Sequence, residues 1–136
     1  SGVRIERYTP HSFYIARYPE GREATLSWPD VDQKWANDTG SGILSDAQVK
    51  SNDITVTFFG TKTWDIEAVK GPRRNVVQPK TIVDARPGCV PQSPNAGFDV
   101  TVTRIFKKNG VQVKTSTFNT RYIPEDGVTC TKPAAG

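Results

Sequence analysis

An Asn109-Gly110 pair stands between two runs in which apolar and polar residues alternate, residues 98–107 and 111–119. Alternation with a period of two is typical of β-strands, because successive side chains point to opposite faces. Asn and Gly tolerate the positive φ angles of a two-residue hairpin loop, so this pair is the strongest short-range hairpin signal available. The sequence therefore predicts a long antiparallel hairpin, which restricts the chain to a fold that contains a sheet.

A two-residue loop also predicts the register of this hairpin. It places Phe106 opposite Val113 and Arg104 opposite Thr115. Arg104 then shares a face with the apolar residues at positions 98, 100 and 102. An arginine on such a face is either buried with a partner or turned away by a β-bulge, and the sequence leaves both open.

Other alternating runs predict further strands, and Gly and Pro residues mark the turns between them. The predicted strands cover residues 3–8, 13–18, 24–28, 33–37, 54–60, 63–70, 81–85 and 128–131. The run at 54–60 has the clearest pattern of a buried strand, and we expect it to form a hairpin with 63–70. No stretch longer than a turn has helical periodicity. The predicted class is all-β, with antiparallel strands and hairpins in a sandwich or partly open barrel, and residues 132–136 are expected to be disordered.

The length of 136 residues suits one domain or two small subdomains, divided by a Gly-Pro boundary into residues 1–72 and 73–136. Charge changes at the same place. Residues 1–70 hold 8 Lys and Arg against 10 Asp and Glu, a net charge of −2, and residues 71–136 hold 10 against 4, a net charge of +6. A basic half attracts anionic partners, but its charges are dispersed as on a solvated surface. No nucleic-acid-reading motif accompanies them, so nucleic acid is not an expected partner, and no apolar run is long enough to predict a membrane span.

The two cysteines, Cys89 and Cys130, lie in loop or strand-end contexts rich in Gly, Pro and Thr. A disulfide between them would close a loop of about 40 residues, which the chain-entropy model values at about 3–4 kcal/mol. That pairing indicates an oxidising, extracytoplasmic location; two free thiols are the alternative. Two cysteines and one histidine do not supply the four ligands of a structural zinc site. We therefore expect no metal and no cofactor.

Residues 3–35 hold the only histidine, His11, and six of the thirteen aromatic residues. His11 and Ser12 are neighbours, so on an extended strand their side chains point to opposite faces and cannot act as a base and its nucleophile. His11 is instead a candidate general acid or base for a nucleophile elsewhere. The alternative is that it closes a turn after Pro10 or packs at a strand end.

Aromatic and acidic side chains of the same stretch have two interpretations each. The aromatic residues are Tyr8, Tyr14, Tyr18, Trp28 and Trp35. They either form a surface on which sugar rings stack or fill a β-core. The acidic residues are Glu20, Glu23, Asp30 and Asp32. An acid/base pair is one interpretation, and solvated turn residues are the preferred one.

Several short motifs follow one another in this stretch. They are Arg7, His11-Ser12, Tyr18-Pro19-Glu20-Gly21, Ala24-Thr25, and an Asp-x-x-aromatic-x-Asn-x-Thr segment formed by Asp32, Trp35, Asn37 and Thr39. This order resembles the VanW family, named from vancomycin-resistance gene clusters. The segments ITVTFFGTK, VTRIFKKNGVQV and RYIPEDGV also look like the C-terminal part of that family. On this resemblance, residues 1–72 form a VanW-like β region and residues 73–136 a basic region with a G5-like hairpin.

The resemblance implies a location at the bacterial cell envelope, extracytoplasmic and anchored to the membrane in a longer protein. The family has a Gly-Gly-x-Cys-Gln segment and a helix just upstream, and the chain has no Met, so we interpret it as a piece of a longer protein. A first hypothesis is a module that presents His11, Tyr14, Arg17 and Trp35 to peptidoglycan or another anionic wall polymer. A second is part of a cysteine-dependent peptidoglycan hydrolase or transferase in which an upstream thiol pairs with His11. A purely structural β module is the third.

Overall fold

The computed structural model describes residues 2–131, and this range contains β-strands and no helix. The strands are β1 (Arg4–Arg7), β2 (Lys34–Ala36), β3 (Ile43–Lys50), β4 (Asp53–Gly60), β5 (Asp65–Lys70), β6 (Arg74–Val77), β7 (Thr81–Asp84), β8 (Gly97–Lys108), β9 (Val111–Tyr122) and β10 (Gly127–Cys130). The all-β prediction is confirmed, and the strands do not close into a barrel. The expectation for residues 132–136 lies outside the described residues.

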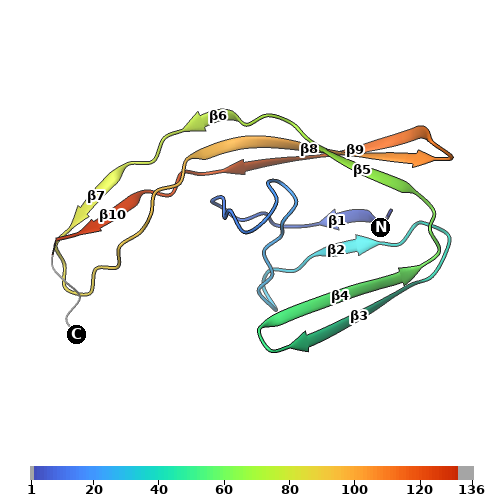
Figure 1. Cartoon of the computed structure of the whole chain (residues 1–136), viewed down its shortest axis with the longest axis horizontal. Helices are drawn as coiled ribbons and strands as arrows, with labels where there is room; N and C mark the ends of the chain where they lie inside the picture. Colours follow the sequence, from blue (N-terminus) through green and yellow to red (C-terminus); the bar gives the residue numbers. More distant parts are fainter. Residues whose placement is uncertain (1, 132–136) are drawn as a thin grey trace.

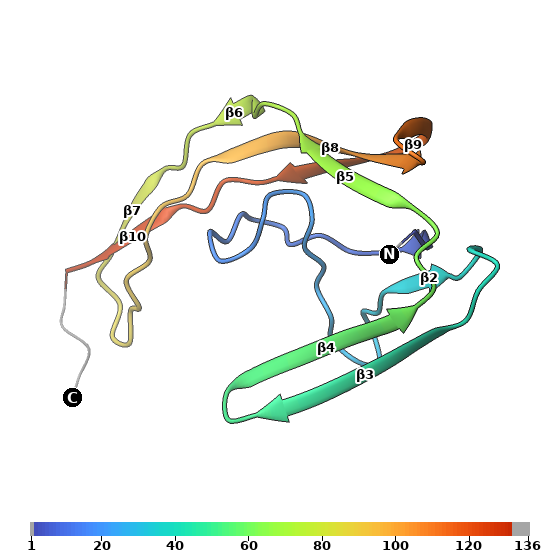
Figure 2. The ribbon, with the colours of Figure 1, turned by 45° about the vertical axis from the view of Figure 1, so that its right-hand side comes forward.

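Strand β8 is the centre of the largest sheet. It pairs antiparallel with β9 along one edge and with β5 and β6 along the other. Figures 1 and 2 show this sheet as a curved ribbon that arches over β1 and the chain that follows it. Its buried side chains are Phe98, Val100, Val102 and Phe106 of β8 and Thr120 and Tyr122 of β9. The division of the chain at residue 72 stays a prediction.

The predicted hairpin between β8 and β9 is confirmed. Lys108 pairs with Val111 across the two-residue loop, and Asn109 and Gly110 have φ angles of 52° and 78°. Positive φ at both central positions defines the type I′ turn that Asn-Gly favours, because its twist matches that of the flanking strands.

The predicted register holds for the first two pairs after the loop and is wrong beyond them, because the ladder contains a bulge. Lys107 pairs with Gln112, but Phe106 pairs with Lys114, so Val113 is an extra residue on β9. From there Arg104 is opposite Ser116 rather than Thr115. An extra residue in one strand reverses which of its side chains face each side of the sheet.

The bulge determines which alternate side chains of β9 face the core. It sets Phe118 opposite Val102 and Tyr122 opposite Phe98, on the face that packs against the N-terminal chain. In the uninterrupted register, Arg121 would take the place of Tyr122. Strand β9 accordingly alternates between exposed odd-numbered and buried even-numbered residues near its end. One inserted residue therefore brings the Tyr122 hydroxyl to the concave side of the sheet.

Deletion of Val113 tests whether it is the extra residue of the ladder. We expect it to change the free energy of unfolding by less than about 1 kcal/mol, because the straight ladder that results still pairs Phe106 with Lys114 and Phe98 with Tyr122. Urea unfolding followed by tryptophan fluorescence measures the change. Val113→Thr is the matched control, since it keeps the residue count at an exposed position and should cost less than about 1 kcal/mol. A loss of about 3 kcal/mol or more in the deletion variant would contradict the argument, because it would show that the core register was lost with Val113.

The strand predicted at 54–60 exists, but two expectations about it are wrong. Strand β4 pairs over its whole length with β3, and the next strand, β5, pairs with β8 instead. The alternating apolar residues of β4 are exposed, with Val56 and Phe58 each 52% accessible. Alternation marks an apolar face, but whether another layer covers that face depends on the route of the whole chain.

The strands predicted at 13–18 and 24–28 are replaced by turns and extended chain. Tyr18 N donates to Ile15 O over 3.1 Å, and the second segment contributes only the isolated bridge between Ser27 and Val31. Both segments lie in the loop between β1 and β2, under the arch of the sheet in Figure 2. Tyr14 packs against the sheet face, whereas Leu26 and Trp28 are 67% and 86% exposed, so local alternation misled the prediction.

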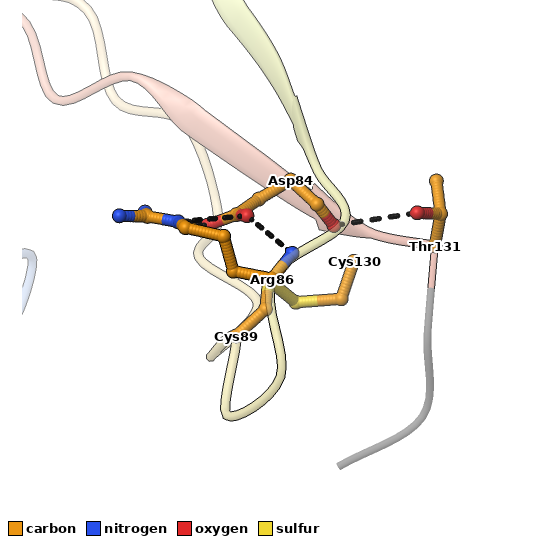
Figure 3. Close-up of a disulfide and its surroundings, with 5 residues drawn as sticks. All are labelled: Asp84, Arg86, Cys89, Cys130 and Thr131. Atoms are coloured by element: carbon orange, nitrogen blue, oxygen red, sulfur yellow. Dashed lines mark hydrogen bonds and ion pairs between the residues drawn. A yellow bond between two sulfur atoms is a disulfide. The ribbon is translucent and has the colours of Figure 1, made fainter.

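The predicted disulfide is confirmed. Cys89 and Cys130 are bridged with 5.8 Å between their Cα atoms. The bridge ties the loop after β7 to the end of β10, and these two strands form a parallel pair. Figure 3 shows Asp84 and Arg86 beside it. Hydrogen bonds from the Arg86 side chain and backbone lower the pKa of Asp84 to about 2.

Removal of the bridge should destabilise this end of the molecule. The two cysteines are 41 residues apart, so Cys89→Ser with Cys130→Ser should lower the free energy of unfolding by about 4 kcal/mol. Amide exchange should accelerate most in β7 and β10, since a two-stranded pair has few other contacts. Intact mass in non-reducing solution checks the starting state, which is about 2 Da lighter than the reduced chain. Unchanged exchange in β7 and β10 would contradict this role.

Candidate functional site

His11 lies in the loop between β1 and β2, and backbone hydrogen bonds on both sides hold this segment. Ile123 N donates to Ser12 O over 2.8 Å, which attaches the loop to the end of β9. Thr25 N donates to Thr9 O over 2.7 Å, which joins the two arms of the loop. These bonds bring His11 close to Glu23, twelve positions further along the chain.

The His11 ring and the Glu23 carboxylate form a close pair. His11 Nδ1 lies 2.8 Å from Glu23 Oε2, and the His11 backbone N–H donates to the same oxygen over 3.1 Å. The Glu23 side chain is 5% exposed and that of His11 is 25% exposed. The other ring nitrogen, Nε2, makes no hydrogen bond to any residue between 2 and 131. A buried carboxylate thus orients an imidazole whose outer nitrogen is available, which is the geometry of a general acid or base.

Tyr122 and Gly21 complete the surroundings of Glu23. The Tyr122 hydroxyl donates to Glu23 Oε1 and accepts a hydrogen bond of 2.8 Å from Gly21 N. Burial raises the pKa of Tyr122, and its hydrogen bond to Glu23 raises it further. Both carboxylate oxygens therefore have donors, which offsets the cost of burying the charge.

A tight turn places Glu23 against the sheet. Arg22 N donates to Pro19 O over 3.1 Å, so Glu20 and Gly21 are the central residues of the turn. Gly21 has a φ of 66°, and a Cβ there would lie 3.0 Å from Val102 Cγ2. Only glycine satisfies both the positive φ and the close approach to the core.

The preferred interpretation of the acidic residues as solvated is wrong for Glu20 and Glu23. Glu20 is 11% exposed and accepts hydrogen bonds from Arg73 and Lys70 at 2.8 and 2.9 Å. The Arg73 hydrogen bond is the main cause that lowers the pKa of Glu20. No local sequence signal pairs Glu23 with His11, because the pair depends on how both arms of the loop pack against β9.

The three predicted ligand-binding residues have different surroundings. Tyr14 packs against Phe98 and Tyr122, and its hydroxyl donates to Tyr18 O over 3.4 Å. The Arg17 side chain is exposed. Trp35 is on β2, and its ring meets Phe58 of β4 at 6.1 Å between centroids. Their role in binding stays a prediction.

The predicted aromatic surface is likewise divided among several places. The Tyr18 ring stacks on His11 at 5.6 Å with an angle of 9° between the planes. Tyr8 meets Phe118 edge-on, and Trp28 is 86% exposed. Of the five aromatic residues, Tyr14 is thus the one packed directly on the buried cluster of Phe98, Val100 and Tyr122.

Within residues 2–131, no three His, Cys, Asp or Glu side chains gather as a metal site would require. The same range has no helix with the length and apolar character needed to cross a membrane.

Comparison with known families bears on the segment that carries His11 and Glu23. Residues 1–59 match the model of a family described as VanW like protein. These residues belong to the VanW-like family. The resemblance predicted from the motifs between Arg7 and Thr39 is confirmed, and the matched range also includes β3 and most of β4. No curated protein and no solved structure matches the chain.

The VanW-like match suggests a cell-envelope protein of the vancomycin-resistance-associated kind. The disulfide agrees with that setting, because such bonds persist in oxidising compartments. The family match of residues 1–59 and the disulfide are together consistent with an extracytoplasmic location.

Tyr122→Phe tests the bonds around Glu23. Loss of the hydroxyl leaves Gly21 N–H unpaired and removes a donor from the carboxylate, so we expect the free energy of unfolding to fall by about 2 kcal/mol at pH 7. Tyr18→Phe, at an exposed ring, should change it by less than about 0.5 kcal/mol. Urea unfolding measures both, and equal changes would contradict the assignment.

The same variant has a predicted pH dependence. The pKa of Tyr122 is raised in the folded state, so its contribution to stability is complete below the ordinary tyrosine pKa of about 10 and is lost as pH rises above it. The difference in stability between the wild type and Tyr122→Phe should therefore shrink above about pH 10.

Proposed function

We propose that this chain supplies the acid/base half of a cysteine-dependent site that acts on peptidoglycan peptides at the bacterial cell envelope. The observation that carries the proposal is the His11–Glu23 pair, in which a carboxylate 5% exposed holds the imidazole at 2.8 Å. The match of residues 1–59 to the VanW-like family supports the envelope location, and the peptidoglycan substrate is part of the proposal.

In this role the His11 ring accepts and donates the proton, and Glu23 holds the ring in position. A carboxylate on Nδ1 fixes the ring orientation and stabilises the imidazolium that forms when Nε2 takes a proton. The contacts of Glu23 with Tyr122 and with the His11 backbone keep the carboxylate from turning away. Because these groups lie on a loop fastened to β9, the pair is held by a rigid sheet.

A cysteine nucleophile has to come from outside the 136 residues, because both cysteines of the chain are in the disulfide. Cys89 and Cys130 are bonded to each other, so neither can act as a thiolate. We propose that an upstream thiol of a longer, membrane-anchored protein approaches His11 Nε2, as the VanW resemblance implies.

Alkylation of that thiol tests the proposal in the longer protein. Iodoacetamide reacts with the thiolate, so the pH profile of the rate reports how strongly the site favours ionisation. We expect His11→Ala to slow alkylation at pH 6 by about tenfold or more, and Glu23→Gln to slow it less, because the ring remains but loses its orientation. Ser12→Ala is the matched control and should not change the profile. An identical profile in the wild type and His11→Ala would refute the pairing.

Binding without chemistry is the second candidate. It is favoured by the stack of Tyr18 on His11, since Tyr18 is partly exposed and flat rings at a surface suit sugar binding. A pulldown on purified sacculi separates the two functions. Two results together would favour a binding module. Tyr18→Ala would lose binding to sacculi, and His11→Ala would have the same alkylation profile as the wild type.

A further inference from the structure

A cavity lies between the N-terminal segment and the concave face of the sheet. Its volume is about 460 Å³, which is within the range of small-molecule sites. The loop side is formed by Ile5, Tyr8, Gln33 and residues 21–24, and the sheet side by Ile66, Ala68, Val102, Arg104 and Phe118. Neither His11 nor the predicted residues Tyr14, Arg17 and Trp35 line it.

Arg104 is the cationic group on the sheet side of this cavity. Its guanidinium lies 5.1 Å from the ring centre of Phe106 and 5.0 Å from that of Phe118. Its hydrogen bonds are long, at 3.3 Å to Val3 O and 3.4 Å to Ser116 Oγ. The Nε–H is buried and has no acceptor among residues 2–131. A guanidinium has five N–H donors, so most of its hydrogen-bonding capacity is unused.

The charge of Arg104 has no carboxylate partner in the part of the chain that the structure describes. Only Arg104 and Lys107 of the basic residues in that part are not exposed, and Lys107 pairs with Glu67 at 2.7 Å. The exposed Arg73 and Arg121 also have carboxylate partners, Glu20 and Asp99. Burial lowers the pKa of Arg104, and no neighbouring anion opposes that shift. A half-buried guanidinium without a counter-ion is costly for stability, which is typical of a position kept for function.

The neighbours of Arg104 leave space for a ligand. Ala68 pairs with it on β5 and Ser116 on β9, and both side chains are small. Glu23, at the other side of the cavity, is bonded to His11 and Tyr122 and so is held away from the guanidinium. Arg22 adds a second positive charge to the lining. Apolar walls with two arginines suit a molecule that has an apolar body and one anionic end.

We propose that this cavity binds a small ligand with an apolar body and a free carboxylate, and that Arg104 pairs with the carboxylate. The planar guanidinium matches a carboxylate with two parallel hydrogen bonds, which a neutral amide cannot accept in the same way. The inference is independent of any acid/base role of His11, because it rests on other atoms. A peptide C-terminus and an aliphatic acid both have this chemistry.

Chemical-shift titration of the 136-residue chain tests the site. The probes are N-acetyl-alanyl-leucine as the free acid, the same dipeptide as its C-terminal amide, and hexanoate. We expect the acid to bind at least tenfold more tightly than the amide, with shifts at residues 66–68, 102–104 and 116–118. Tighter binding of the dipeptide acid than of hexanoate identifies a peptide ligand, and the reverse identifies an aliphatic acid.

Variants connect the preference to Arg104. Arg104→Gln should abolish the difference between acid and amide, Arg104→Lys should retain part of it, and Ala68→Leu should weaken both probes by filling the cavity. Arg121→Gln is the matched control, since this arginine lies on the other face of β9 and should leave binding unchanged. Equal affinity for acid and amide in the wild type overturns the proposal whatever the variants do. A preference that survives in folded Arg104→Gln overturns it as well.

Discussion

The bulge at Val113 is the constraint on which the concave face of the sheet depends. A hairpin with a type I′ loop and no bulge would be an equally regular ladder, but it would turn Arg121 toward the core. With one extra residue in β9, Phe118 and Tyr122 face inward beside Val102 and Phe98. The same insertion sets Ser116 opposite Arg104. Both the buried cluster and the cavity wall therefore follow from a single change of register.

Glu23 connects the loop to that face. A buried carboxylate is stable only when its oxygens have donors, and the donors here come from His11 and from Tyr122. Tyr122 reaches the carboxylate because β9 has the bulged register, and Gly21 allows the loop to approach Val102 closely. The VanW-like segment and the C-terminal hairpin thus meet at one hydrogen-bond network, although the family match covers only the former.

The two proposed sites use the two sides of Glu23. On one side the carboxylate orients His11, whose outer nitrogen is available for proton transfer. On the other side it borders the cavity that contains Arg104. Glu23 thus borders both sites, whereas β7 and β10 form a separate pair at the disulfide end of the molecule.

The sequence by itself determined the all-β class, the Asn109-Gly110 hairpin, the VanW-like motifs and the Cys89–Cys130 bridge. These features rest on local chemistry: alternation, the φ tolerance of Asn-Gly, and the presence of only two cysteines. Tertiary structure alone decided that β4 is exposed and pairs with β3, that residues 13–18 form turns, and that β9 contains a bulge. It also decided the partner of His11, since Glu23 looked like a solvated turn residue until Gly21 and Tyr122 fixed its place. Burial and pairing depend on contacts between residues about a hundred positions apart, and a local pattern contains no information about them.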